Sequence, residues 1–274
     1  MRGVSTNVED RRGRTARGLL GGGIGTIILA VIVALMGGNP LDFIGSQLGQ
    51  VEEPYEETAE ERELAEFASV VLAETEDVWT ELFSKELGME YEYPGMVLYS
   101  GFVQSACGAA DSSVGPFYCS ADQKIYLDLS FYTELKERFR APGDFAMAYV
   151  IAHEVGHHVQ YQLGILDKVM SQRGRLSEKE YNKLQVMMEL QADYFAGVWA
   201  HYAERSNLLE EGDIEEALNA ASAVGDDRIQ KDTRGYVVPD SFTHGSSEQR
   251  ARWFYKGFQL GTISGGDTFN APEF

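Results

Sequence analysis

Two histidines with a glutamate between them form the part of this chain best suited to chemistry. Residues 153–157 read HEVGH, an HExxH pattern inside a run with helical spacing of apolar residues. Residues four apart share one face of a helix, so His153 and His157 can direct two imidazoles at one metal ion. Zn²⁺ binds histidine nitrogen at roughly 2.0–2.1 Å and keeps a position for water in catalytic sites. Glu154 can take a proton from that water, and together these groups predict zinc-dependent hydrolysis of a peptide bond.

A pattern with three fixed positions also arises by chance, and two such histidines can simply pack or form hydrogen bonds. A third ligand would favour the metal site. Glu189 and Asp193 lie four residues apart in an otherwise apolar stretch, where unpaired carboxylates are costly. We predict that Glu189 is the third zinc ligand. We predict that Asp193 accepts an N–H from His153 or His157 and fixes its tautomer.

Alternatives to this ligand set remain open. The two carboxylates could lie at the solvent edge or pair with Arg173 or Arg175. His201, further along the same predicted helix, is a weaker candidate for the third ligand. His158 follows His157 directly but points about 100° away on a helix, so we expect it beside the site or on the surface.

A further histidine, His244, lies in a turn before a predicted helix that begins with Ser246 and Gln249 as a capping box. A side chain in such a turn can reach into a site. His244 could donate a hydrogen bond to the oxyanion formed when water adds to the peptide carbonyl. It could equally brace the site by binding an aspartate or the backbone.

Hydrophobic periodicity predicts the helices that must position these groups. An amphipathic helix is expected over residues 61–87, ended by Gly88. A short helix is expected over residues 131–139. The helix that carries HExxH is expected to begin with a cap at Asp144 and to stop at Gly164.

Capping boxes mark two more helix starts. Ser177 and Glu180 begin the helix that carries the predicted third ligand, and Asp213 and Glu216 begin the next one.

Residues 89–132 have β character, and strands are expected at 96–103 and 124–129. Strand 124–129 is a candidate for an edge strand that pairs with an extended substrate beside the metal. It could equally be an ordinary strand of the sheet.

The N-terminal region predicts a membrane anchor. Residues 1–18 are basic and polar, which indicates a disordered cytoplasmic tail, and residues 19–38 contain no charge, enough to cross a bilayer as a helix. Residues 39–60 form an acidic linker, and residues 61–274 form the catalytic domain. The basic-then-acidic order places that domain outside the cell membrane. A cleaved signal peptide is the alternative.

The predicted anchor also contains Gly21 and Gly25, whose G-x-x-x-G spacing is a weak signal for a dimer through the membrane segment.

The formal net charge of −20 argues against nucleic acid as a partner. The chain has two cysteines, Cys107 and Cys119. In an oxidising compartment such a pair is expected to form a disulfide. The alternative, that both cysteines bind zinc, fits their spacing poorly.

Several motifs occur in a fixed order and carry a family resemblance. They read CGAADSSVGPFYC, KIYLDLSFY, HEVGHHVQ, ELQADYFAGVWA, FTHGSSEQRARWF and GDTFNA. With them the chain resembles the predicted neutral zinc metallopeptidases of bacteria from about residue 60 to its end. More distantly, HExxH followed by ExxxD and a late histidine is similar to the gluzincins, although the interval before Glu189 is longer than in thermolysin-like enzymes.

The resemblance implies zinc at His153, His157 and Glu189. It also implies that Glu154 is the catalytic base and that one N-terminal anchor holds the domain outside the membrane.

We therefore expect an α+β, zincin-like fold: a mainly helical catalytic domain with a small β-sheet, preceded by one transmembrane helix. The expected function is that of a membrane-anchored zinc metalloendopeptidase acting on peptides or proteins. The alternative is a non-catalytic, membrane-tethered zinc-binding module that presents a surface to a partner protein. A purely structural site has no use for a carboxylate at Glu154, so this residue favours the enzyme.

Overall fold

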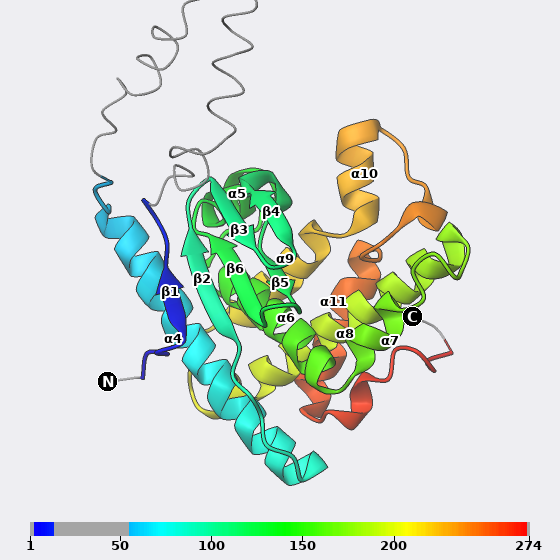
Figure 1. Cartoon of the computed structure of the whole chain (residues 1–274), viewed down its shortest axis with the longest axis horizontal. Helices are drawn as coiled ribbons and strands as arrows, with labels where there is room; N and C mark the ends of the chain where they lie inside the picture. The colour runs from blue at the N-terminus through cyan, green and yellow to red at the C-terminus, as the bar shows by residue number, and fades with distance from the viewer. Residues whose placement is uncertain (1–2, 14–54, 273–274) are drawn as a thin grey trace, which may run out of the picture.

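The computed structural model describes residues 3–13 and 55–272, which form a mostly helical body with two small sheets (Figure 1). The helices are α4 (Ala59–Leu82), α5 (Phe131–Glu137), α6 (Asp144–Gln162), α7 (Ile165–Met170), α8 (Glu178–Arg205), α9 (Asp213–Ala223), α10 (Asp226–Arg234) and α11 (Ser247–Leu260). The strands are β1 (Val8–Asp10), β2 (Gly95–Tyr99), β3 (Phe102–Ser105), β4 (Gly108–Asp111), β5 (Phe117–Cys119) and β6 (Lys124–Asp128). A π-helical turn, η1 (Phe83–Leu87), and three 3₁₀ turns, η2 (Ser112–Val114), η3 (Pro239–Ser241) and η4 (Ser264–Gly266), complete these elements.

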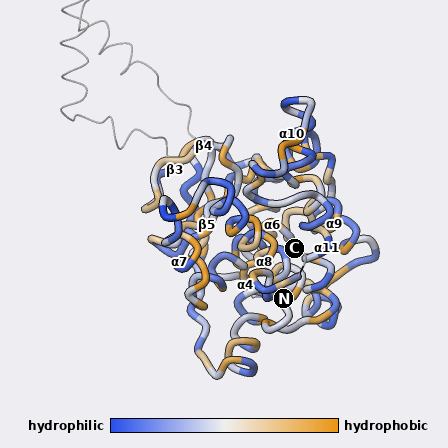
Figure 2. Tube along the Cα trace, turned by 90° about the vertical axis from the view of Figure 1, so that its right-hand side faces the viewer, coloured by the Kyte–Doolittle hydropathy of each residue, from blue (hydrophilic) through white to orange (hydrophobic). Residues whose placement is uncertain are grey.

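Helices α6 and α8 lie at the centre of the molecule. Most of α6 is buried, and α8 is buried at every position from Leu190 to Ala200, as expected for helices that are apolar on several faces. Hydrophobic stretches accordingly run through the middle of the molecule, whereas the outer turns are largely hydrophilic (Figure 2). The two helices approach closely at Gly156, where an added Cβ would lie 3.0 Å from the carbonyl oxygen of Ala192. A glycine inside the HExxH motif therefore lets α8 come near the two histidines.

Helix α11 packs against α8 through two reciprocal glycines. A Cβ added at Gly197 would lie 1.9 Å from the carbonyl oxygen of Phe254, and one at Gly257 would lie 2.0 Å from that of Tyr194. Neither position can accept a larger residue without moving a backbone. This contact fixes α11, and the turn before it, against the helix that carries Glu189.

The four-stranded sheet has the order β1-β2-β6-β5. Strands β1, β2 and β6 run parallel, and β5 runs antiparallel to β6. Strand β6 therefore lies inside the sheet, and the prediction that residues 124–129 form an edge strand is wrong. Within the described residues the edge beside α6 belongs to β5. Residues 125–128 of β6 are all buried, as is typical of an interior strand, whereas β5 has too few residues to show a pattern.

The predicted strand 96–103 is in fact two strands. The chain turns at Gly101, which has a φ of +75° that favours glycine. Strand β2 ends before this turn, and β3 begins after it and pairs with β4 in a separate hairpin. The turn at the end of this hairpin carries Cys107, and the predicted disulfide to Cys119 on β5 is confirmed.

Most predicted helix ends are confirmed. Helix α4 continues into the π-helical turn η1, which ends at Gly88 in the left-handed conformation. The capping boxes at Ser177 and Ser246 are both formed. Two predicted caps are wrong. Asp144 is the first residue of α6, whose cap is Gly143, and Asp213 is likewise the first residue of α9. These acidic residues favour the helix starts through the helix dipole rather than as caps.

The N-terminal residues, predicted to be disordered, form part of the fold over residues 3–13. Strand β1 pairs with Met96–Leu98 of β2. Ser5 and Asn7 each donate a hydrogen bond of 2.8 Å to Glu76 on α4. The turn after β1 is held to the segment before α4 by ion pairs, because the buried Arg12 guanidinium lies 2.6 Å from Asp10 and 2.8 Å from Glu57.

This pairing overturns the predicted membrane topology. A single crossing between residues 13 and 55 would put β1 and β2 on opposite sides of a bilayer, where they could not pair. Gly13 and Tyr55 are instead neighbours, and a Cβ added at Gly13 would lie 2.5 Å from the Cβ of Tyr55. The predicted extracytoplasmic catalytic domain with a cytoplasmic N-terminus is therefore withdrawn.

The predicted transmembrane helix is also not supported. No helix in the described ranges 3–13 and 55–272 is long and apolar enough to span a bilayer. Residues 19–38, with the glycine pair proposed for dimerisation, lie outside these ranges. The fold class is corrected to a mostly helical protein with small sheets.

The ion pairs of Arg12 test whether residues 3–13 dock on the body. The Arg12 side chain is 3% exposed, whereas Arg62, which binds the other oxygen of Glu57, is 67% exposed. We expect Arg12→Ala to lower the free energy of unfolding by about 1–2 kcal/mol, because it leaves two carboxylates without their buried partner. Arg62→Ala is the matched control and should have a much smaller effect, since exposed pairs are screened by water. Urea titration measures both, and equal effects would contradict the docking.

Candidate metal centre

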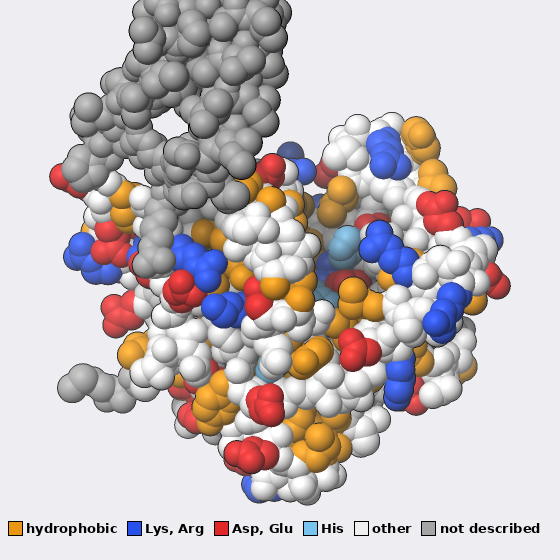
Figure 3. Space-filling view, in the orientation of Figure 1, with side chains coloured by type: hydrophobic (Ala, Val, Ile, Leu, Met, Phe, Trp, Pro, Cys, Tyr) orange, Lys and Arg blue, Asp and Glu red, His pale blue; other side chains and the backbone are white. Residues whose placement is uncertain are grey.

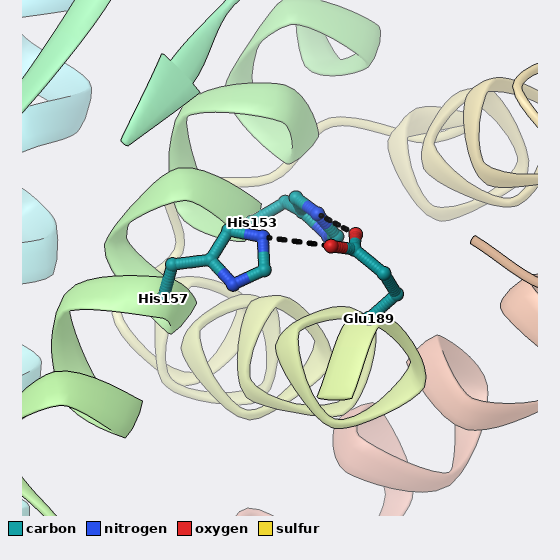
Figure 4. A group of neighbouring side chains, drawn as sticks. All are labelled: His153, His157 and Glu189. Atoms are coloured by element: carbon teal, nitrogen blue, oxygen red, sulfur yellow. Dashed lines mark hydrogen bonds and ion pairs between the residues drawn. The ribbon is translucent and has the colours of Figure 1, made fainter. Parts of the chain in front are cut away.

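Three side chains from α6 and α8 converge on one point. Nε2 of His153 lies 3.2 Å from Oε2 of Glu189, and Nε2 of His157 lies 3.5 Å from its Oε1. One ligand atom from each residue lies within 4.8 Å of the others. Figure 4 shows the glutamate reaching from α8 toward both imidazoles of α6. The three residues that the sequence assigned as metal ligands are thus brought together.

The spacing of these atoms fits a tetrahedral zinc ion. Ligands at roughly 2.0–2.1 Å from a tetrahedral centre are separated from one another by about 3.3 Å. The two nitrogen-to-oxygen distances, 3.2 and 3.5 Å, lie close to that value. Two imidazoles and one carboxylate are also the donor types of catalytic zinc sites, which keep a fourth position for water.

Hydrogen bonds on the far side of each ring set the tautomers that such a site needs. Nδ1 of His153 lies 2.8 Å from Asp193, and Nδ1 of His157 lies 2.9 Å from Oε1 of Gln160. Both partners are acceptors, so each Nδ1 carries a proton, and each Nε2 is the nitrogen left to bind a metal ion once it is deprotonated.

Asp193 is completely buried and held by groups that the sequence did not assign to it. The guanidinium of Arg250 donates to its two carboxylate oxygens at 2.8 and 2.9 Å, and Tyr149 donates its hydroxyl at 2.5 Å. The cation beside the buried carboxylates is therefore Arg250 on α11, and the alternative pairing with Arg173 or Arg175 is not found.

The position of His157 depends on a chain of side-chain amides. Nε2 of Gln160 donates to the backbone oxygen of Met188 at 2.7 Å and to Oε1 of Gln191 at 3.0 Å. Gln191 in turn donates to the backbone oxygen of Gly266 at 2.7 Å. These bonds connect the second histidine through α8 to the C-terminal segment.

The centre contains more negative than positive charge. Glu154, Glu189 and Asp193 supply three carboxylates, and Arg250, bound to Asp193, is the one permanently cationic side chain that pairs with them among the described residues. With both histidines neutral, as metal binding requires, this leaves two negative charges in a largely buried volume. Such an excess is costly unless a cation balances it, and a divalent ion would do so.

The pKa shifts have the same cause. Burial lowers the pKa of His153, but the carboxylates of Asp193 and Glu189 outweigh it and raise this pKa to about 10. Burial raises the pKa of Glu189, but the imidazoles of His157 and His153 outweigh it and hold this pKa well below its usual range. The centre thus favours positive charge between these groups.

The three side chains lie in a cleft of about 700 Å³, which Glu154 also lines. Figure 3 shows a hollow on this face, with histidine and acidic side chains visible inside it and hydrophobic side chains around it. Apolar walls are contributed by Phe117, Phe139, Val150 and Leu166. The Glu154 carboxylate forms no hydrogen bond with any described residue, so it remains available to a molecule in the cleft.

His244 lines the same cleft and is fixed by Asp226, a residue that the sequence analysis missed. Asp226 accepts the backbone N–H groups of Thr243 and His244 at 2.7 and 2.6 Å, and its other oxygen lies 3.3 Å from Nδ1 of His244. Burial lowers the pKa of His244, but the hydrogen bond to Asp226 and the charge of Glu189 outweigh burial. The pKa of His244 is therefore raised above its usual value. Both predicted roles, bracing the turn and reaching the cleft, fit this position.

The remaining two histidines are not part of the ligand group. His201 binds the backbone oxygen of Phe258 at 2.8 Å and lies away from the cleft lining. His158 is fully buried on the other side of α6, where its ring contacts Tyr118 and the backbone of Glu92. Burial lowers the pKa of His158 to about 4, so it is neutral.

The supporting residues could be found only in part from the sequence. Tyr149 lies four residues before His153, and the spacing alone places it on the same helix face. Arg250 and Asp226 lie on other helices, and their distance along the chain gives no signal of contact with Asp193 or His244.

Comparison with known proteins gives the class to which this fold and site belong. The chain belongs to the family described as "Putative neutral zinc metallopeptidase", whose sequence model matches residues 1–269. YpfJ of Escherichia coli K12 is 48% identical over 276 residues, covering 97% of this chain and 96% of YpfJ. Rv2575 of Mycobacterium tuberculosis H37Rv is 45% identical over 194 residues, covering 67% of this chain and 64% of that protein. Neither relative's name states an activity, and no solved structure matches the chain.

The amide that orients His157 provides a test of the centre. Gln160→Leu keeps the side-chain bulk but removes the acceptor, so the ring loses its fixed tautomer. We expect zinc affinity to fall by about 10–100-fold, as for other partners of metal-bound histidines. Gln162→Leu, on the same helix but bonded to Glu92, is the control and should leave affinity unchanged. Competition with a chromogenic chelator measures both, and an unchanged Gln160→Leu affinity would contradict this role.

Proposed function

We propose that the protein is a gluzincin-like endopeptidase that hydrolyses peptide bonds in extended polypeptides, with zinc held by His153, His157 and Glu189. The observation that carries the proposal is the Glu154 carboxylate, which faces the cleft beside the three ligands with no partner among the described residues. The zinc peptidase family supports the cofactor and the class of reaction.

Zinc bound to these residues would lower the pKa of a water toward about 7 and polarise the peptide carbonyl. Glu154 accepts the proton of the attacking water and returns it to the leaving amine. Asp193 and Gln160 hold the two imidazoles with Nε2 directed at the centre. Arg250 keeps Asp193 ionised by its buried ion pair, so the orientation of His153 persists through the cycle.

His244 is the candidate donor to the oxyanion that forms when water adds to the carbonyl. It lines the cleft, and Asp226 fixes its turn and raises the pKa of its ring, which favours the protonated imidazole. A protonated imidazole directed at developing negative charge stabilises the transition state more than the ground state.

Strand β5 is the candidate for substrate pairing in place of the predicted 124–129. Phe117 and Tyr118 line the cleft together with His153 and His157, and the outer edge of β5 is unpaired among the described strands. An extended peptide added to this edge would form main-chain hydrogen bonds and lie across the metal centre. Apolar walls on both sides favour unfolded or extended segments with bulky apolar side chains.

The alternative, a non-catalytic zinc-binding module, shares the ligand geometry but leaves Glu154 without a role. A structural zinc site is usually closed by four protein ligands, whereas this centre offers three ligands next to an open cleft. The geometry therefore favours the enzyme.

Glu154→Gln tests the catalytic base. The substitution keeps the size and polarity of the side chain but removes its basicity, so zinc should stay bound while turnover falls by at least about 10²-fold. Release of peptides from denatured casein, with zinc content measured on the same sample, distinguishes the two effects. Cleavage at the wild-type rate would show that Glu154 is not the base, and absence of chelator-sensitive cleavage by the wild type would contradict the proposed function.

His244→Ala tests the oxyanion role. Loss of one such donor typically lowers kcat by about 10²–10³-fold while binding of metal and substrate is largely retained. His201→Ala, which removes a histidine outside the cleft, is the control and should retain kcat. A His244→Ala variant that changes only thermal stability would show that the residue braces the turn.

A further inference from the structure

Strand β5 has little to hold it in place through the sheet alone. It consists of Phe117–Cys119, paired to β6 on one side only. An edge strand of this length is marginal without further contacts. The disulfide of Cys119 ties β5 to the β3–β4 turn but not to α6, which carries the metal ligands.

Among the described residues, one side-chain hydrogen bond joins the middle of β5 directly to α6, beside ring contacts of Tyr118 with His158 and Tyr161. The hydroxyl of Tyr118 lies 2.8 Å from Nδ1 of His158. Nε2 of His158 lies 2.7 Å from the backbone oxygen of Glu92, so Nε2 carries the ring proton and Nδ1 accepts the tyrosine hydroxyl. The imidazole is completely buried, the two bonds satisfy both nitrogens, and the side-chain amide nitrogen of Gln162 also lies 2.8 Å from Nε2.

The position of His158 in the sequence links this contact to the metal-ligand group. It directly follows His157, so two adjacent residues of one buried helix bind different parts of the cleft. His157 presents Nε2 to the metal centre, and His158 binds β5 through Tyr118 on another side of the helix. The distance between the metal-ligand group and the strand is therefore set within a single turn of α6.

We propose that Tyr118 and His158 are positioning residues that fix β5 relative to the metal centre and so set the register of a bound polypeptide. This inference rests on the proposed peptidase function and on substrate pairing with β5. Neither side chain needs to touch the reacting atoms. Their effect should appear in the binding of substrates long enough to pair with the strand.

Tyr118→Phe removes the hydroxyl and keeps the ring, so the fold should persist. We expect KM for a blocked octapeptide, chosen from a site cleaved in denatured casein, to rise about three- to tenfold, as expected for one lost buried hydrogen bond. The kcat value, zinc content and KM for a blocked dipeptide with the same scissile bond should remain unchanged. Amide hydrogen exchange over residues 117–119 should become faster even without zinc or substrate. Tyr194→Phe removes another buried hydroxyl, bound to the backbone of Thr262 at 2.7 Å, and is the matched control.

The proposal would be overturned if KM rose equally for the octapeptide and the dipeptide, or if zinc content fell. It would also be overturned if neither amide hydrogen exchange nor the octapeptide KM changed. If the wild type cleaves neither peptide, the proposed function fails separately. Anisotropy of a labelled octapeptide on the zinc-loaded Glu154→Gln protein then decides the positioning role. Binding weakened three- to tenfold by the added Tyr118→Phe change supports it, and unchanged binding overturns it.

Discussion

The buried crossing of α6 and α8 places carboxylates from two helices where water is scarce. Asp193 is neutralised by Arg250, while Glu189 faces two imidazoles whose protons are directed away from it. The remaining negative charge requires a cation between the helices, and the spacing of the donors suits zinc. The crossing of α6 and α8 fixes the hydrogen-bond partners of both imidazoles. It also leaves the Glu154 carboxylate facing the cleft beside them.

The local parts of the centre could be predicted because they follow from helical periodicity. His153 and His157 share a face at a spacing of four residues, and so do Glu189 and Asp193. Apolar neighbours indicated that both helices are buried. A shared metal centre was then expected, because a cation lowers the free-energy cost of burying the carboxylates. Asp193, which orients His153, could be predicted, but Arg250 and Gln191 could not, because they act through contacts set only by the packing of α11 and the C-terminal segment.

Errors in the fold arose where a short or uniform pattern has more than one structural solution. In the run 124–129 apolar residues alternate with Lys124, Tyr126 and Asp128, and such alternation cannot distinguish an edge strand from an interior one. Strand β5 has three residues and shows no pattern at all. The N-terminal residues were assigned to a tail on composition, although β1 pairs with β2 and Arg12 is buried against Asp10 and Glu57. These long-range contacts leave no trace in local sequence.

The contact between Gly13 and Tyr55 holds two residues that are far apart in the sequence side by side on the body. When the two ends of a segment are held together, the entropy of closing it grows slowly, by about 0.6 kcal/mol for each doubling of a flexible segment. A change of chain length between these two residues should therefore put little strain on the described body. This site is the natural place in the molecule to graft a reporter or an affinity module, provided that β1 stays paired.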